Sequence, residues 1–190
     1  MIDDLYSQFH KDPKIGIACL YADYKDQTNQ NLVHILGSLL RQFLTTALEP
    51  IPNEVIQKLH DIQRRGGKVG TEDILAMLEV RLQQLKRAFI CIDAVDELEP
   101  RVQRQLLEVL KELSADITRL FLTGRGHIEI EVQKCLLPIG QECKIIISAS
   151  EQDIQEFLEQ QIMNDLNPDA MDEELAKKII TAIIEKSQGM

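Results

Sequence analysis

The chain has 190 residues and carries 21 lysines and arginines against 31 aspartates and glutamates, a formal net charge of −10 at pH 7. A chain of this length predicts one domain, which buries roughly 70% of its unfolded surface. The negative charge argues against nucleic acid as a partner, because phosphate contacts need clustered lysine and arginine. No apolar run approaches the ~20 residues of a membrane span, so we expect no membrane as a partner either.

The four cysteines stand at positions 19, 91, 135 and 143 and form no CxxC pair. Two of them fall inside predicted strands. This spacing is typical of buried thiols in a reducing compartment rather than of a metal site. We therefore expect a cytoplasmic protein.

The first third of the chain alternates between helix and strand patterns. Residues 3–10 predict the last turns of a helix, because Pro13 imposes extended geometry just after it. Ile15–Tyr21 is an apolar run of the length that a buried strand needs. Apolar positions recur three and four apart between residues 30 and 48, which predicts an amphipathic helix, and a further helix is expected at 53–65.

The middle third surrounds a second buried strand. Gly66-Gly67-Lys68-Val69-Gly70 predicts a flexible loop, after which Thr71 is expected to cap a helix that runs to about residue 86. The buried strand follows at residues 88–95. Pro100 then predicts the first turn of a helix that ends near residue 114, since proline suits a position whose N–H has no helical acceptor.

The last third contains two more predicted strands, RLFLT at 119–123 and an isoleucine run at 144–147. Between them, residues 128–137 predict a short helix, although their alternating apolar residues also fit a strand. Helices at 151–164 and 171–187 are expected to close the chain.

This order of elements predicts the fold class. Buried strands that alternate with amphipathic helices indicate an α/β protein with a parallel sheet flanked by helices. We expect residues 1–150 to form the α/β domain and residues 151–190 to begin a separate helical subdomain. No internal repeat is visible.

Acidic residues follow the strand at 88–95, namely Asp93, Asp96 and Glu97. Open α/β sheets bind ligands beyond the carboxyl ends of their strands, and Mg²⁺ is held by one or two carboxylates together with substrate phosphates. The cluster therefore predicts a magnesium site. The alternative is that these carboxylates are only solvated at the end of the strand. Arg125, just beyond the strand at 119–123, would lie across the same crevice, where it could meet a phosphate.

Several segments resemble one family. FICIDAVDEL resembles the Walker B strand of the STAND class of P-loop NTPases, and among them of the NACHT family, while LFLTGR resembles their sensor 1 segment, which ends in arginine. IGIACLYADYKDQ followed by NLVHILGSLLRQF is similar to the second strand and following helix of fungal NACHT proteins, often fused to ankyrin or WD repeats. The resemblance extends over nearly the whole chain and implies a P-loop NTPase-like fold.

The resemblance also implies a role for each site residue. Asp93 would hold Mg²⁺ directly or through water, and Asp96 and Glu97 would orient or polarise the attacking water. Arg125 would sense the γ-phosphate. ATP and Mg²⁺ are thus the expected cofactors of the intact module, an ATP-dependent signalling switch whose expected partners are nucleotide, further copies of itself or other protein domains.

The Walker A loop of the family, G-x-x-x-x-G-K-[ST], is missing, although its N–H groups and lysine cradle the phosphates. Gly67-Lys68 comes nearest, but Val69 replaces the serine or threonine and Ile62 replaces the first glycine. We expect the missing strand and loop to lie upstream of Met1, and the alternative is a gene product that has lost its phosphate-binding edge. The chain alone is then expected to bind nucleotide very weakly and to hydrolyse essentially none.

The missing loop has a structural consequence and leaves other functions open. The family's loop strand lies between the strands that correspond to 119–123 and 144–147, so these two are expected to pair directly or to leave unpaired edges that favour association. A rival hypothesis is a non-catalytic interaction scaffold that retains the NTPase fold. A third is an α/β enzyme that uses the acidic cluster for another phosphoryl chemistry.

Overall fold

The computed structural model describes residues 2–9, 11–46, 50–114, 117–136, 143–147, 149–164 and 172–187. The chain divides into two compact units, Met1–Gln141 and Glu142–Met190, and each has its own packing. None of the helices in the described ranges is long and apolar enough to cross a membrane.

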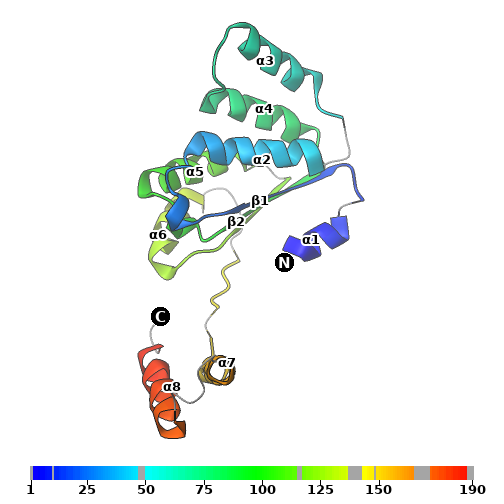
Figure 1. Cartoon of the computed structure of the whole chain (residues 1–190). Helices are drawn as coiled ribbons and strands as arrows, with labels where there is room; N and C mark the ends of the chain where they lie inside the picture. Colours follow the sequence, from blue (N-terminus) through cyan, green and yellow to red (C-terminus); the bar gives the residue numbers. More distant parts are fainter. Residues whose placement is uncertain are drawn as a thin grey trace. The chain divides into compact units, whose positions relative to one another are not determined.

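The first unit is built on a sheet of three parallel strands in the order β1-β2-β3 (Figure 1). These strands are β1 (Ile15–Tyr21), β2 (Arg87–Asp93) and β3 (Thr118–Leu122). They confirm three of the four predicted strands and the predicted α/β class with a parallel sheet. In-register pairing, such as that of Cys19 with Cys91, brings the carboxyl ends of the strands to one edge of the sheet.

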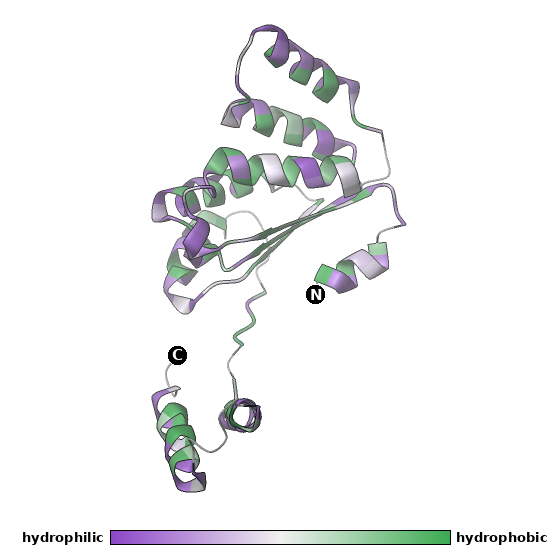
Figure 2. Cartoon of the chain, in the orientation of Figure 1, coloured by the Kyte–Doolittle hydropathy of each residue, from purple (hydrophilic) through white to green (hydrophobic). Residues whose placement is uncertain are grey.

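Most of the helices cover one face of this sheet in successive layers (Figure 1). The covering helices are α2 (Leu32–Thr46), α3 (Asn53–Arg64), α4 (Thr71–Gln83), α5 (Pro100–Leu113) and α6 (Glu129–Leu136). α2 contacts β1, α4 packs on α2, and α3 packs on α4. Their apolar side chains form one core with Ala18, Ile90 and Ile92 of the strands, and the middle of the sheet is correspondingly green in Figure 2.

The opposite face is covered by α1 (Ile2–Phe9), which confirms the predicted N-terminal helix. Leu5, Tyr6 and Phe9 pack there against a second, smaller core. The rings of Phe9 and Phe89 stack with their centroids 5.4 Å apart. The sheet is therefore apolar on both faces, as its strand sequences predict.

Helix boundaries follow the sequence with one correction. Pro100 is the first residue of α5, as predicted, and residues 129–136 form a helix rather than a strand. The prediction that Thr71 caps α4 is wrong, because Gly70 is the N-cap and Thr71 is the first helical residue. The carboxylate of Asp73 accepts a hydrogen bond from the Gly70 N–H at 3.2 Å and so satisfies one of the free donors of the helix end.

The glycine-rich stretch that comes nearest to a Walker A loop is the end of α3. Gly66 has a φ of 63°, its N–H bonds to the carbonyl of Gln63 at 3.0 Å, and the N–H of Gly67 bonds to the carbonyl of Ile62 at 3.1 Å. This pair of bonds, with a left-handed glycine between them, is a common way to end a helix. The prediction of a loop at this position is confirmed.

The prediction of a strand at residues 144–147 is wrong. Residues 143–147 join no sheet in the described part of the chain, and Ile145, Ile146 and Ile147 are 77%, 78% and 89% exposed. Isoleucine favours a strand only where the strand pairs with neighbouring strands and the side chain packs against a covered face. Within the described ranges, β2 is the single strand that pairs with β3.

The second unit contains α7 (Glu151–Met163) and α8 (Glu173–Ser187), which pack on each other and confirm both predicted C-terminal helices. The hydroxyl of Ser150 accepts a hydrogen bond from the Asp153 N–H at 3.1 Å, and the Asp153 carboxylate accepts one from the Ser150 N–H at 2.9 Å. This reciprocal capping box fixes the start of α7. Hydrogen bonds from the Ser150 side chain and backbone lower the pKa of Asp153.

Candidate functional site

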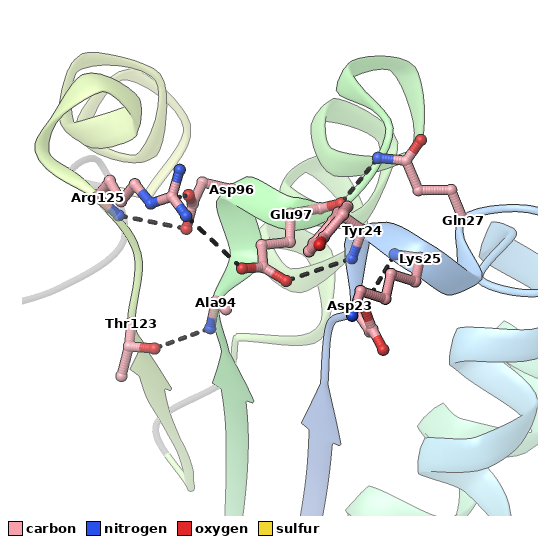
Figure 3. Close-up of polar contacts among 9 residues, drawn as sticks. All are labelled: Asp23, Tyr24, Lys25, Gln27, Ala94, Asp96, Glu97, Thr123 and Arg125. Atoms are coloured by element: carbon pink, nitrogen blue, oxygen red, sulfur yellow. Dashed lines mark hydrogen bonds and ion pairs between the residues drawn. The ribbon is translucent and has the colours of Figure 1, made fainter. Parts of the chain in front are cut away.

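The predicted site residues lie where the three strands end (Figure 3). β2 ends at Asp93 and continues into the short helix η2 (Val95–Glu97). β1 leads through Asp23 into the short helix η1 (Tyr24–Asp26), and β3 is followed by Thr123, Gly124 and Arg125. Parallel pairing in register thus brings three loops that are distant in sequence to one edge of the sheet.

Thr123 joins the tip of β3 to the tip of β2. Its hydroxyl donates a hydrogen bond to Oδ1 of Asp93 and accepts one from the N–H of Ala94 at 2.8 Å. Its backbone carbonyl also accepts a hydrogen bond from the N–H of Val95 at 2.9 Å. The Asp93 carboxylate is exposed at the strand tip, where this hydroxyl holds one of its oxygens.

The turn between β2 and η2 has a special backbone conformation at Ala94. This residue has φ 54° and ψ 48°, the left-handed region that residues with a Cβ rarely adopt. Two hydrogen bonds, from the N–H groups of Ala94 and Val95 to Thr123, hold the chain in this turn. This turn places the η2 carboxylates beside the tip of β3.

Arg125 is in contact with both carboxylates of η2 (Figure 3). Its backbone N–H donates to Oδ1 of Asp96 at 3.2 Å, its Nε lies 3.5 Å from Oδ2 of Asp96, and its Nη2 lies 3.8 Å from Oε1 of Glu97. The Asp96 side chain is only 4% exposed, whereas that of Arg125 is 76% exposed. Both guanidinium contacts are longer than a normal hydrogen bond, so the exposed guanidinium of Arg125 is only weakly held.

Glu97 also connects to the loop after β1. Its Oε2 accepts a hydrogen bond from the N–H of Tyr24 at 3.2 Å, and its backbone carbonyl accepts one from Nε2 of Gln27 at 3.0 Å. One side chain therefore contacts the loops that follow β1 and β3 at once. The predicted residues Asp96, Glu97 and Arg125 meet directly, and Thr123 links Asp93 to the same edge.

Gly124 leaves room for this contact. A Cβ at this position would lie 2.5 Å from Cδ1 of Ile128 and 3.2 Å from Oδ1 of Asp96. Any larger residue would push on the side chain that anchors η3 (Gly126–Ile128) in the core, or on the Asp96 carboxylate. The glycine between Thr123 and Arg125 is thus required by packing.

Three contributing residues were not singled out in the sequence, namely Thr123, Tyr24 and Gln27. Thr123 had a usable signal, because it directly follows a predicted strand and precedes Arg125. Tyr24 contributes a backbone N–H, which no side-chain pattern reveals. Gln27 contributes an amide from a loop whose path the sequence does not predict.

The donor set fits a hard cation in part. Asp93 offers one exposed carboxylate at the strand tip, which suits Mg²⁺ when water and phosphate oxygens supply the other ligands. In the part of the chain that the structure describes, no group of three histidine, cysteine, aspartate or glutamate side chains could hold a metal by itself. Chemically, this edge can therefore offer one cation ligand, two carboxylates and one exposed guanidinium.

One comparison with known proteins finds a matching family. A family model described as Nephrocystin 3, N-terminal, matches residues 1–125, which is 125 of the 190 residues. The chain belongs to this family. No curated protein and no solved structure matches the chain.

The region shared with the nephrocystin 3 N-terminal family includes the whole candidate site. It runs from α1 through all three strands and ends at Arg125. Asp93, Asp96 and Glu97 therefore lie within the domain that defines the family. α6 and the second unit lie outside the matched residues.

Proposed function

We propose that this chain is part of a NACHT-type signalling NTPase module, an ATP-dependent switch. The observation that carries the proposal is the convergence of Asp93, Asp96, Glu97 and Arg125 at the carboxyl edge of a parallel sheet. Ligands of open α/β sheets bind at this edge. Membership of the nephrocystin 3 N-terminal family is consistent with a NACHT-related protein and supports the same proposal.

Each residue has a proposed role in the intact module. Asp93 is the ligand for Mg²⁺, and Thr123 positions its carboxylate through the hydroxyl hydrogen bond. Asp96 and Glu97 orient or polarise the attacking water, and Arg125 contacts the γ-phosphate. Bound Mg²⁺ with ATP would supply a polarised phosphoryl group, and the protein residues contribute positioning and charge.

In this proposal, the ion pairs at this edge belong to the resting state of the module. Arg125 pairs with Asp96 and Glu97, so these carboxylates contact the guanidinium in place of an attacking water. The weak hold on Arg125 allows a phosphate to attract it. Because the sequence has no Walker A loop, we expect this chain alone to bind nucleotide weakly and to hydrolyse essentially none.

A non-catalytic interaction scaffold is the second candidate function. It is favoured by the same ion pairs, since Asp96, Glu97 and Arg125 satisfy one another and tie three loops together without any ligand. In that case the site residues stabilise the strand tips and the helices contact partner proteins.

Calorimetric titration of the chain with ATP in the presence of Mg²⁺, up to millimolar concentration, separates the candidates. The Asp93→Asn variant removes the proposed cation ligand, and Glu99→Gln removes a nearby exposed charge whose side chain makes no helix-cap bond. The NTPase proposal expects weak binding that Asp93→Asn lowers by about tenfold or more, which is 1.4 kcal/mol, and that Glu99→Gln leaves unchanged.

The other outcomes each favour another function. Binding that is absent, or equal in all three proteins, contradicts the NTPase proposal and favours the scaffold. Mg²⁺ binding that depends on Asp93 but shows no preference for nucleotide favours another phosphoryl chemistry.

A further inference from the structure

Two cysteines face each other on neighbouring strands inside the first unit. Cys19 of β1 and Cys91 of β2 are register partners in the parallel ladder, and side chains that pair in register lie on the same face of a sheet. This is the face that α1 covers, where Cys19 packs with Tyr6 and Phe9. A hydrogen bond joins the two thiols, so their sulfur atoms are neighbours.

The backbone of β1 is held from both sides at this pair. On one side, β1 is bonded to β2. On the other side, the N–H of Cys19 donates to Oε1 of Gln42 at 2.9 Å, and the carbonyl of Cys19 accepts from Nε2 of Gln42 at 2.8 Å. Paired strands lie about 4.8 Å apart, and disulfides join residues whose Cα atoms are about 4.4–6.8 Å apart. The two sulfurs can therefore be joined without a change of register.

We propose that Cys19 and Cys91 form a redox-sensitive dithiol site, which hydrogen peroxide or another small hydroperoxide converts into a disulfide and a small thiol reduces again. The two cysteines differ in access. Cys19 is half-buried, whereas Cys91 is only 2% exposed. Cys19 is therefore the thiol that the oxidant reaches, and Cys91 is the resolving thiol.

The oxidation takes place in two steps that balance. The Cys19 thiolate attacks one oxygen of the peroxide, so that an S–O bond forms, the O–O bond breaks and hydroxide leaves as water after it takes up a proton. The Cys91 thiolate then attacks the sulfur of this sulfenic acid, so that an S–S bond forms, the S–O bond breaks and a second water leaves. The two sulfurs lose two electrons in total, and the peroxide gains them.

The surroundings of the pair determine how fast it reacts. Burial raises the pKa of Cys19, although the hydrogen bond from Cys91 opposes this rise. Burial also raises the pKa of Cys91, to about 12. Because the thiolate is the reactive form, the site is oxidised slowly at neutral pH. The Cβ atoms of a disulfide lie about 3.8 Å apart, closer than paired strands, so the bond draws β1 toward β2 and is easily reduced.

Peptide mapping of the full chain tests the site. The reduced protein is treated with millimolar hydrogen peroxide, blocked with N-ethylmaleimide and digested with trypsin without reduction. Cleavage after lysine and arginine places Cys19 in peptide 15–25, Cys91 in peptide 88–101, and the other two cysteines together in peptide 135–144. We expect peptides 15–25 and 88–101 to be linked in a chain that stays monomeric on a non-reducing gel, and dithiothreitol to separate them.

The same oxidation in concentrated urea is the matched control. In the unfolded chain, loop entropy alone favours the short link between Cys135 and Cys143 over the link between Cys19 and Cys91 by roughly 25-fold. Relative to the short link, the link between Cys19 and Cys91 should be at least about tenfold more abundant in the folded chain than in urea. An equal ratio in the two states would overturn the proposal, and so would links that form only between chains.

Serine variants test the order of the two steps. In Cys91→Ser the sulfenic acid at Cys19 has no resolving thiol, so dimedone should label peptide 15–25. In Cys19→Ser, peptide 88–101 should stay unlabelled. The opposite labelling would overturn the assignment of Cys19 as the attacking thiol. If either variant does not fold, as judged by circular dichroism, the ratio of links in the folded and unfolded wild type decides.

Discussion

The hydroxyl of Thr123 lies 2.8 Å from the backbone N–H of Ala94 and accepts a hydrogen bond from it across the tips of β3 and β2. The same hydroxyl donates to the carboxylate of Asp93. One side chain thus controls the left-handed turn and the position of the proposed cation ligand. Stability and site geometry at this edge depend on the same residue.

Replacement of Thr123 by valine keeps the shape of the side chain and removes both hydrogen bonds. We expect the free energy of unfolding to fall by about 1–2 kcal/mol, because each net hydrogen bond contributes about 1 kcal/mol. Urea unfolding followed by circular dichroism measures the change. Thr123→Ser keeps the hydroxyl and should lose less than half as much, whereas equal losses in the two variants would mean that methyl packing matters and the hydrogen bonds do not.

Replacement of Ala94 by glycine should stabilise the chain. Ala94 is the one non-glycine residue with positive φ among those that the structure describes. A left-handed conformation costs about 1–2 kcal/mol for a residue with a Cβ. Glycine avoids this cost, but part of the gain is lost because glycine raises the conformational entropy of the unfolded chain. The same urea measurement should show a net gain of about 0.5–1 kcal/mol. Ala88→Gly, in the buried part of β2, should instead lose stability, and a loss in both variants would show that the turn at Ala94 is unstrained.

Replacement of Gly124 by alanine tests the packing behind the ion pairs. The new Cβ would overlap with Ile128 and press on Asp96, so we expect a loss of about 1–3 kcal/mol, the usual cost of overpacking. Gly126→Ala is the matched control, since a Cβ there would meet nothing within 4 Å. It should leave the midpoint of thermal unfolding unchanged or slightly raised. A Gly124→Ala variant as stable as the control would mean that Ile128 moves aside without cost.

The sequence predicts the fold where local patterns decide it. The apolar runs at β1 and β2 and the spacing of apolar residues in α2 correspond to buried elements, and the run at β3 corresponds to a half-buried strand. The acidic residues and Arg125 meet because the parallel order brings strand ends to one edge, a rule that needs no tertiary detail. This is why their proximity could be predicted from the sequence.

The sequence fails where a distant partner decides the outcome. The isoleucines at 145–147 have strand-forming side chains but belong to no strand in the described part of the chain, and they are exposed. Arg81 shares the buried face of α4 with Met77 and Leu78 although it is charged. Its Nε reaches the Phe43 carbonyl at 3.1 Å and its Nη1 reaches the Pro50 carbonyl at 3.3 Å. Those carbonyls come from other segments, so a helical pattern cannot reveal them.

The pH dependence of stability should contain a contribution from Cys91. Burial, and secondarily the neighbouring thiol of Cys19, raise the pKa of Cys91 from 9.0 to about 12. Because the folded-state pKa is raised, the protonated Cys91 thiol contributes to the stability of the folded chain. This contribution is fully present below pH 9 and is lost progressively as the pH rises toward 12. Under reducing conditions, the difference in unfolding free energy between the wild type and Cys91→Ala should therefore shrink between pH 8 and pH 11. Cys143→Ala, at an exposed position, should follow the wild type at every pH. A difference between the wild type and Cys91→Ala that stays constant across this range would mean that Cys91 titrates alike in the folded and unfolded chains.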